Sequence, residues 1–284
     1  MKKKVLIIVI CLCICIFLSI ISSISNKEQY LDEDLNNNIN IINVVNEKGV
    51  DKNIDYKKIL NGKSVAMIGD SLIEGYGNEN GGLNVYLAKK MPNAQYSNYS
   101  KSGSTVTNNT GDGNIIMANQ ARSIGVNPNI ILFDGGVNDI IGYDMNFLNV
   151  DLKKPIGSID IKTEGPSSEN TVMADFEQIV QILKTRFPNA KLCYVGLCLL
   201  DDTSINMLAK QVEHKDEMKQ RRDEFFVQIK LLCEKWNISY LDLTSKFVGT
   251  GIKYRQEDWL HINEEGYKLV SPYILSFMAE SISE

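Results

Sequence analysis

Cysteine is scarce in this sequence, and the spacings that would give its thiols a shared function are missing. The chain has six cysteines, but three of them fall within the first 15 residues, which leaves Cys193, Cys198 and Cys233. Cys193 and Cys198 are five residues apart in an expected strand, an odd separation that points their side chains to opposite faces. No Cys-Xaa-Xaa-Cys spacing is present. The sequence therefore predicts buried free thiols rather than a disulfide framework, and it offers no pattern for a metal site.

Concentrated positive charge is also absent after the first four residues. The chain has 30 basic and 35 acidic side chains, and without Lys2, Lys3 and Lys4 the balance becomes 27 against 35, a net charge of −8. Nucleic-acid binding needs a cluster of lysine and arginine that faces the phosphates, so no nucleic acid is expected as a partner. With 44% hydrophobic and 23% charged residues in 284, the composition also excludes a collagen-like, a largely disordered or a multi-pass membrane protein.

Long apolar runs are confined to one place, from Val5 to Ile24, directly after the three lysines. Twenty residues span about 30 Å as a helix, the thickness of the hydrocarbon core of a bilayer. The sequence predicts an N-terminal membrane anchor over residues 1–25, with the lysines in the cytoplasm and the rest of the chain outside. A cleaved signal peptide is the alternative, although the run is longer than the apolar part of a signal and Ser23-Ile24-Ser25 is a weak cleavage site. Both alternatives export the remaining chain.

The residues after the apolar run divide into two regions of different composition. Residues 26–62 are rich in Asn and charge and read as a stalk or linker, although Ile39–Val45 could add a short strand. From Lys63 to the end, residues 63–284, β-rich runs alternate with helical stretches, which is typical of an α/β domain with a parallel sheet. The expected strands are Ser64–Ile68, Ala94–Tyr99, Asn129–Phe133, Lys191–Val195 and Ile238–Leu241. The expected helices are Leu83–Met91, Ile115–Ile124, Val172–Phe187, a long charged one near Ile205–Trp236, and Glu264–Ser281. Ile140–Asn170 has no strong period and is expected to form a long loop that covers or walls a site.

A serine follows the first expected strand at the place where open α/β sheets build their sites. Gly69-Asp70-Ser71-Leu72 comes directly after Ser64–Ile68, and a glycine-rich run, EGYGNENGG, leaves Ser71 room to face a substrate. Serine becomes a nucleophile only where a base removes its proton and donors receive the charge on the substrate oxygen. The competing interpretation is a strand-to-helix turn with Asp or Ser as the N-cap.

Two further motifs offer such donors. Gly103, in Ser102-Gly103-Ser104, lets a backbone N–H approach a bound oxygen closely. Asn138 follows two glycines after the run NIILFD and carries a side-chain amide at a strand end. Each motif read alone also fits an ordinary loop or β-turn.

The chain has two histidines, so candidates for a base near neutral pH are few. His214 lies in a highly charged helical stretch and is expected at the surface. His261 stands before the last expected helix, three residues after Asp258, which can orient the imidazole and stabilise its charged form. The alternative is a loop that contains both residues by chance.

Together these motifs resemble the GDSL, or SGNH, hydrolase family, which lacks the Gly-Xaa-Ser-Xaa-Gly elbow of the α/β-hydrolases. The resemblance covers the chain from Lys63 to the end, in the order of the family. It implies a three-layer α/β/α sandwich of flavodoxin-like fold with a five-stranded parallel sheet. It also implies Ser71 as nucleophile with His261 and Asp258. The oxyanion hole is implied to comprise the N–H groups of Ser71 and Gly103 and the Asn138 amide. This chemistry requires no metal and no organic cofactor.

Membership does not name a substrate, because members act on lipids, aryl esters, acetylated sugars and thioesters. We expect a serine esterase that acts outside the membrane on a short acyl ester, such as an O-acetyl group on a glycan or lipid of the cell envelope. An O-acyltransferase that uses the same residues is the alternative. An inactive binding module is a third hypothesis, disfavoured because the serine, asparagine, aspartate and histidine are all present.

Overall fold

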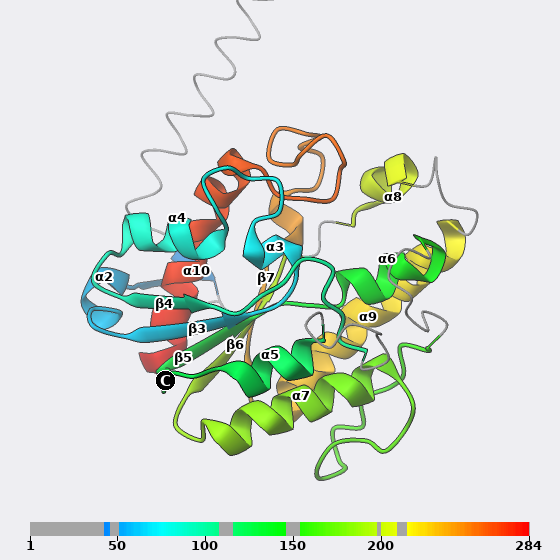
Figure 1. The fold of residues 1–284 in the computed structure, drawn as a ribbon, viewed down its shortest axis with the longest axis horizontal. Coiled ribbons are helices and arrows are strands. Elements are labelled where there is room, and N and C mark those ends of the chain that lie inside the picture. The colour runs from blue at the N-terminus through cyan, green and yellow to red at the C-terminus, as the bar shows by residue number, and fades with distance from the viewer. Residues whose placement is uncertain are drawn as a thin grey trace, which may run out of the picture. The chain divides into compact units, whose positions relative to one another are not determined.

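The computed structural model describes residues 43–45, 51–107, 116–145, 154–197, 200–208 and 215–283. Residues 54–284 form one compact unit (Figure 1). Within residues 1–53, strand β1 (Asn43–Val45) pairs antiparallel with β2 (Asp51–Asn53). The predicted anchor, most of the predicted stalk, Cys198 and His214 lie outside the described residues.

A five-stranded parallel sheet forms the centre of the compact unit. In spatial order its strands are β4 (Gln95–Asn98), β3 (Ser64–Ile68), β5 (Ile130–Phe133), β6 (Lys191–Gly196) and β7 (Ser239–Asp242). The three central strands are almost wholly buried and read as continuous apolar runs, whereas the edge strands carry polar residues. This difference is expected for a parallel sheet that is covered on both faces.

The order of the strands creates a crevice at one end of the sheet. The chain passes from β3 to β4 on one side and then returns to β5 on the other side. Where the direction of winding reverses, the segments that follow neighbouring strands separate, and ligands bind in the gap beyond the carboxyl ends. Here that gap lies beyond β3 and β5, the strands that precede Ser71 and Asn138.

Helices cover both faces of the sheet and complete the three-layer sandwich that the sequence predicts (Figure 1). On one face lie α2 (Tyr56–Ile59), α4 (Leu83–Lys90) and α10 (Glu264–Ser283). On the other lie α5 (Met117–Ser123), α7 (Val172–Arg186) and α9 (Lys215–Lys235). The shorter α3 (Ser71–Glu74), α6 (Val137–Met145) and α8 (Asp202–Leu208) follow the carboxyl ends of β3, β5 and β6.

The prediction of one long helix near Ile205–Trp236 is wrong, because this stretch contains α8 and α9 as separate helices. Asp202 of α8 forms ion pairs with Lys219 at 3.1 Å and with Arg222 at 2.8 Å. On one straight helix, 17 residues would separate Asp202 and Lys219 by roughly 25 Å, so the chain has to fold back between them. The charged pattern alone could not show this, because it continues on both sides of the break.

The prediction of a loop over Ile140–Asn170 is wrong at its start, since Ile140 and Ile141 belong to α6. Residues 154–170 are held against the helices rather than over a cavity, whereas Ile141, in α6, lines the pocket beside Ser71. Lys154 forms a buried ion pair with Asp175 of α7 at 2.5 Å, and the Ile159 N–H donates to Gln228 of α9 at 2.8 Å. None of residues 154–170 lines the pocket beside Ser71, so this part of the stretch is not a wall of that site.

The compact unit begins at Ile54, whereas the sequence predicts its boundary at Lys63. Helix α2 packs against α10, and the Leu60 side chain is fully buried. One helical turn and a single buried leucine are too short a signal to separate from a linker. Cys193 and Cys233 are buried free thiols, as predicted. In the part of the chain that the structure describes, no helix has the length and apolar character needed to cross a membrane.

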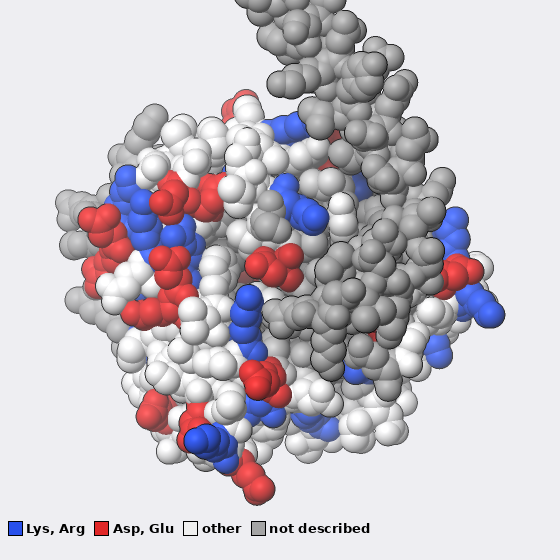
Figure 2. Space-filling view, turned by 180° about the vertical axis from the view of Figure 1, so that it is seen from behind, with Lys and Arg blue, Asp and Glu red and all other residues white. Residues whose placement is uncertain are grey.

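Charged side chains at the surface form mixed clusters. Figure 2 shows acidic and basic side chains side by side on the face that it displays. Lys268 on α10, for example, pairs with both Glu264 and Glu265. Pairs of this kind are common on solvated surfaces and contribute little to stability. The exclusion of nucleic acid as a partner stays a prediction.

Candidate active site

Ser71 lies at the junction of strand β3 with a helix of a single turn. Strand β3 ends at Ile68, and α3 begins at Ser71 itself. Asp70 caps this helix, because its Oδ1 accepts the Leu72 N–H at 2.9 Å. Ser71 itself is 5% exposed and lines a pocket. The capping turn and the nucleophile position are therefore compatible, since Asp70 is the cap and the Ser71 hydroxyl is left for other partners.

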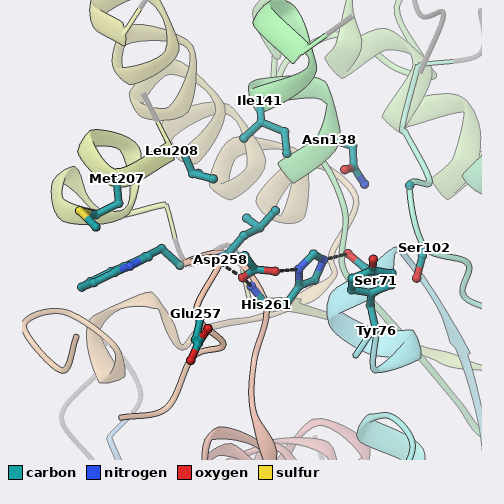
Figure 3. Close-up of a pocket in the computed structure, with 13 residues that line it drawn as sticks. Ser71, Tyr76, Ser102, Asn138, Ile141, Met207, Leu208, Glu257, Asp258 and His261 are labelled. Atoms are coloured by element: carbon teal, nitrogen blue, oxygen red, sulfur yellow. Dashed lines mark hydrogen bonds and ion pairs between the residues drawn. The ribbon is translucent and has the colours of Figure 1, made fainter. Parts of the chain in front are cut away.

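The turn before α10 carries both Asp258 and His261. Asp258 Oδ1 accepts the backbone N–H groups of Leu260 and His261, each at 2.9 Å. Its other oxygen, Oδ2, lies 2.6 Å from His261 Nδ1, and His261 Nε2 lies 2.9 Å from Ser71 Oγ. Figure 3 shows the three side chains joined in one line. A neutral imidazole with its proton on Nδ1 presents the Nε2 lone pair to the serine hydroxyl.

The hydrogen bonds around Asp258 keep its carboxylate ionised. Partial burial by itself raises the pKa of Asp258, but hydrogen bonds from His261 and from the Leu260 N–H outweigh it and lower the pKa to about 2. At neutral pH the carboxylate therefore carries a negative charge that can stabilise an imidazolium on His261.

Three hydrogen-bond donors belong to residues that line the same pocket: the N–H groups of Ser71 and Gly103 and the side-chain amide of Asn138. Asn138 Nδ2 donates one hydrogen to the Ser104 carbonyl at 2.7 Å, which orients the amide and leaves its second hydrogen available. Within the described residues, no protein group accepts a hydrogen bond from the N–H of Ser71 or Gly103. The site thus offers donors that a negatively charged oxygen could use.

Close packing fixes the segment that carries Asn138. Gly136 has a φ of +101°, and a Cβ atom at this position would lie 2.1 Å from the ring of Phe225. The Asp139 carboxylate accepts the N–H groups of Val106 and Thr107, each at 2.9 Å. Helix α6 is therefore tied to the segment that follows Gly103, and the two donor-bearing segments hold a common position.

Residues 67–269 of the chain match the GDSL-like lipase/acylhydrolase family. The chain belongs to this family. It is an ester-hydrolysing enzyme, as the resemblance in its motifs implies.

Solved structures show the same fold as this hydrolase at low sequence identity. A protein from Lactobacillus plantarum is 19% identical with a TM-score of 0.56, over 78% of this chain and 98% of that protein. A carbohydrate acetylesterase family member from Sinorhizobium meliloti is 16% identical with a TM-score of 0.53, over 76% of this chain and 99% of that protein. The chain has no match among curated protein sequences.

The pocket of the hydrolase has a volume of about 590 Å³. Its apolar lining comes from separate parts of the chain: Tyr76, Ile141, Met207, Leu208, Trp259 and Leu260. Figure 3 shows Ile141, Met207 and Leu208 on one side of His261 and Tyr76 on another. The charged residues of the described lining are Glu257 and Asp258, with no lysine or arginine among them. In the described part of the chain, no group of three His, Cys, Asp or Glu side chains is arranged to hold a metal ion.

Gln120 of α5 ties the loop of the nucleophile to the loop of Gly103, and no sequence motif marks it. Its Oε1 accepts the Gly69 N–H at 2.8 Å, and its Nε2 donates to the Gly69 carbonyl at 3.0 Å and to the Ser104 hydroxyl at 2.6 Å. The side chain is 4% exposed, so these polar groups depend on one another for partners. A lone glutamine on a short helix gives no such signal before the packing of α5 on β3 is known.

Two buried carboxyl groups, Asp70 and Asp134, follow the carboxyl ends of β3 and β5 and are 0% and 1% exposed. Burial raises the pKa of Asp70 to about 6, although the Leu72 N–H lowers it. Burial also raises the pKa of Asp134 well above its usual range, and the charge of Asp70 adds to this effect. Two adjacent buried negative charges cannot both be solvated, so burial and the charge of Asp70 both favour the protonated form of Asp134.

Proposed function

We propose that this hydrolase is a serine esterase that removes short acyl groups, such as acetyl, from neutral hydroxyl-bearing molecules of the glycan type. The observation that carries the proposal is the continuous chain of hydrogen bonds from Asp258 through His261 to Ser71, whose own N–H has no acceptor among the described residues. A serine with a base within hydrogen-bond reach, and a base held by a third group, is the arrangement that nucleophilic acyl transfer needs.

In the proposed reaction, Ser71 Oγ attacks the ester carbonyl while His261 Nε2 takes the hydroxyl proton. The negatively charged oxygen of the tetrahedral intermediate accepts hydrogen bonds from the N–H of Ser71, the N–H of Gly103 and the amide of Asn138. Collapse of the intermediate breaks the bond to the alcohol, which receives the proton from His261 as it leaves. A water molecule then attacks the acyl-enzyme by the same route and releases the acid.

The surroundings of His261 support a neutral, ring-shaped alcohol. The leaving oxygen has to lie next to His261 Nε2, and the Tyr76 ring lies 4.7 Å from the imidazole ring, with Tyr76 55% exposed. An exposed aromatic ring provides an apolar face for a sugar. No lysine or arginine stands in the described lining to bind an anionic group. The Sinorhizobium meliloti protein of the same fold is named as a carbohydrate acetylesterase family member.

A substrate panel tests this proposal. We expect release of p-nitrophenol to fall from the acetate through the butyrate to the octanoate ester, and release of free acetate from acetylated xylan. Ser71→Ala should lower all of these rates by at least about 10⁴-fold. Wild-type rates in Ser71→Ala, or a preference for octanoate, would contradict the proposal. With a free glycan added, acetylated glycan in place of free acetate would identify an O-acyltransferase instead.

We also propose that the domain works outside the cell membrane, held there by the apolar run between Val5 and Ile24. The three lysines before this run support that orientation. Digestion of intact cells with an added protease tests it. The domain should be degraded without lysis, and protection in intact cells would contradict the proposal.

A further inference from the structure

We infer that Glu74 is a positioning residue for the oxyanion hole, acting on Gly103 through Ser102. The inference rests on the proposed function, since it concerns the same intermediate. Glu74 touches no reacting atom. Its carboxylate holds the loop of residues 101–103 so that the Gly103 N–H stays within reach of the substrate oxygen.

The contacts of Glu74 converge on one residue of that loop. Glu74 Oε2 accepts hydrogen bonds from both the backbone N–H and the hydroxyl of Ser102, each at 2.5 Å. Its second oxygen, Oε1, lies 3.6 Å from Lys101 Nζ. Two donors on one residue, both to a carboxylate oxygen, restrain the backbone and the side chain of Ser102 together.

The loop that Glu74 holds is the one that presents Gly103. The Ser104 N–H donates to the Lys101 carbonyl at 3.1 Å, which closes a tight turn around residues 102 and 103. Gly103 has a φ of +77° in this turn. Ser102 and Gly103 both line the pocket. Because the Ser102 N–H is bound to Glu74, the next N–H along the chain is the one left for a substrate.

Glu74 and Ser71 lie on the same helix, so the contact of Glu74 with Ser102 links the nucleophile to the Gly103 loop. Ser71 and Glu74 are the first and last residues of α3. The hole needs N–H groups from two segments that are far apart in sequence, at Ser71 and at Gly103. A carboxylate on the helix of Ser71 that binds the residue before Gly103 sets the distance between these two donors. In Figure 3, Ser102 lies on the side of Ser71 opposite to His261, so the contact between Glu74 and Ser102 is separate from the base.

The contact is strongest with a carboxylate, whose charged oxygen can accept both hydrogen bonds from Ser102. Both Ser102 groups donate to the same oxygen of Glu74. Gln can keep one oxygen acceptor but loses the charge that strengthens both bonds, whereas Ala removes them altogether. Misplacing a donor by about 1 Å can lower the rate by about 100-fold. We therefore expect graded losses rather than an all-or-none effect.

The test compares Glu74→Gln, Glu74→Ala and Ser102→Ala with the wild type on p-nitrophenyl acetate. We expect kcat to fall about 3- to 10-fold in Glu74→Gln and about 10- to 100-fold in Glu74→Ala, with KM changed less than about 3-fold. Ser102→Ala, which keeps the backbone bond, should lose less than about 5-fold. The pKa values read from the pH profile of kcat/KM should not move, because Glu74 does not contact His261.

Two further measurements separate positioning from a general loss of structure. Trifluoroacetone adds to the serine hydroxyl and places an oxyanion in the hole, so its inhibition constant should rise by the factor by which kcat/KM falls. Glu265→Gln serves as the matched control, since Glu265 pairs with Lys268 on the surface of α10. This control should keep wild-type values, and the Glu74 variants should keep the wild-type melting temperature.

A wild-type kcat in Glu74→Ala would overturn the inference. So would a loss of kcat accompanied by unchanged inhibition by trifluoroacetone. These failures differ from failure of the proposed function, in which Ser71→Ala itself would keep activity whatever residue stands at position 74.

Discussion

The two sides of the candidate active site are held by different kinds of interaction. On the nucleophile side, Ser71 and Asn138 lie where strands β3 and β5 run into helices, and the two residues are 5% and 4% exposed. On the base side, Asp258 and His261 lie in an irregular turn, and their side chains are 42% and 14% exposed. One side belongs to the packed sandwich, whereas the other is attached to its surface.

The side chains of the site are therefore positioned in two ways, by contacts between distant segments and by a local turn. Ser71 and Asn138 take their positions from contacts between distant segments, such as those of Gln120 with Gly69 and Ser104. His261 takes its position from Asp258, three residues away, whose two oxygens bind the backbone of the turn and the imidazole. Substitution of Asn138, or of a buried side chain that binds these segments, should therefore lower both activity and fold stability. Substitution of Asp258 or His261 should lower activity with little change in stability.

The largest loss of kcat from a change on the base side alone is expected for Asp258→Asn. An amide facing His261 Nδ1 favours the other tautomer, which removes the lone pair from Nε2, so kcat should fall by about 10³-fold or more. The backbone bonds of the turn can remain, so the melting temperature should change little. Steady-state kinetics and thermal unfolding measure both quantities.

The matched control for this variant is Asp242→Asn, because Asp242 also accepts a backbone N–H two residues ahead, from Thr244, at 2.8 Å. It should keep wild-type activity. A wild-type kcat in Asp258→Asn would show that the turn does not orient the base.

A smaller loss is expected on the nucleophile side from Asn138→Ala. Loss of one oxyanion donor typically lowers kcat by about 10²–10³-fold. The variant also leaves the buried Ser104 carbonyl without its amide partner, which should lower the free energy of unfolding by about 1–3 kcal/mol. Hydrolysis of p-nitrophenyl acetate and urea denaturation measure the two effects.

Asn119→Ala, at a half-buried position of α5, is the control for Asn138→Ala. Its kcat and its free energy of unfolding should both stay close to the wild-type values. An Asn138→Ala protein with wild-type kcat would remove this side chain from the oxyanion hole.

The smallest expected effect is a dependence of the free energy of unfolding on pH, caused by the buried carboxyl groups on the nucleophile side. The raised pKa values of Asp70 and Asp134 mean that the folded state retains protons that the unfolded state loses above about pH 4. The free energy of unfolding should therefore fall as pH rises from 4 through about 6, by up to about 1.4 kcal/mol per pH unit for each group. Asp134→Asn, which cannot ionise, should match the wild type near pH 4 and exceed it in stability by a margin that grows as the pH rises to 8.

Urea denaturation at pH 4.5, 6 and 8 checks this expectation, with the surface variant Asp223→Asn as control. The wild type and Asp134→Asn should diverge as pH rises. Parallel pH profiles for the two proteins would mean that Asp134 is ionised in the folded state.

Much of the sandwich could be predicted because its local signals are strong. The buried central strands are continuous apolar runs, and the long helices α7 and α10 carry apolar residues at helical spacing. Helix α3 is indicated only as a strand-to-helix turn, because it has a single turn, and α6 could not be predicted because it begins inside a motif that also fits a β-turn. The division into α8 and α9 could not be predicted either, since the charged pattern continues through both helices.

The sequence by itself determined which residue types stand at the carboxyl ends of the strands, and hence the family and its ester chemistry. Neighbours in the chain also determine how Asp258 holds His261, because all hydrogen bonds of the Asp258 carboxylate are to residues within three positions. Only the tertiary structure decided that Gln120 and Glu74 flank the Gly103 loop and that Tyr76, Met207 and Ile141 share one pocket. The physical reason is that such contacts depend on which segments the parallel crossovers bring together, and no local pattern encodes that distance.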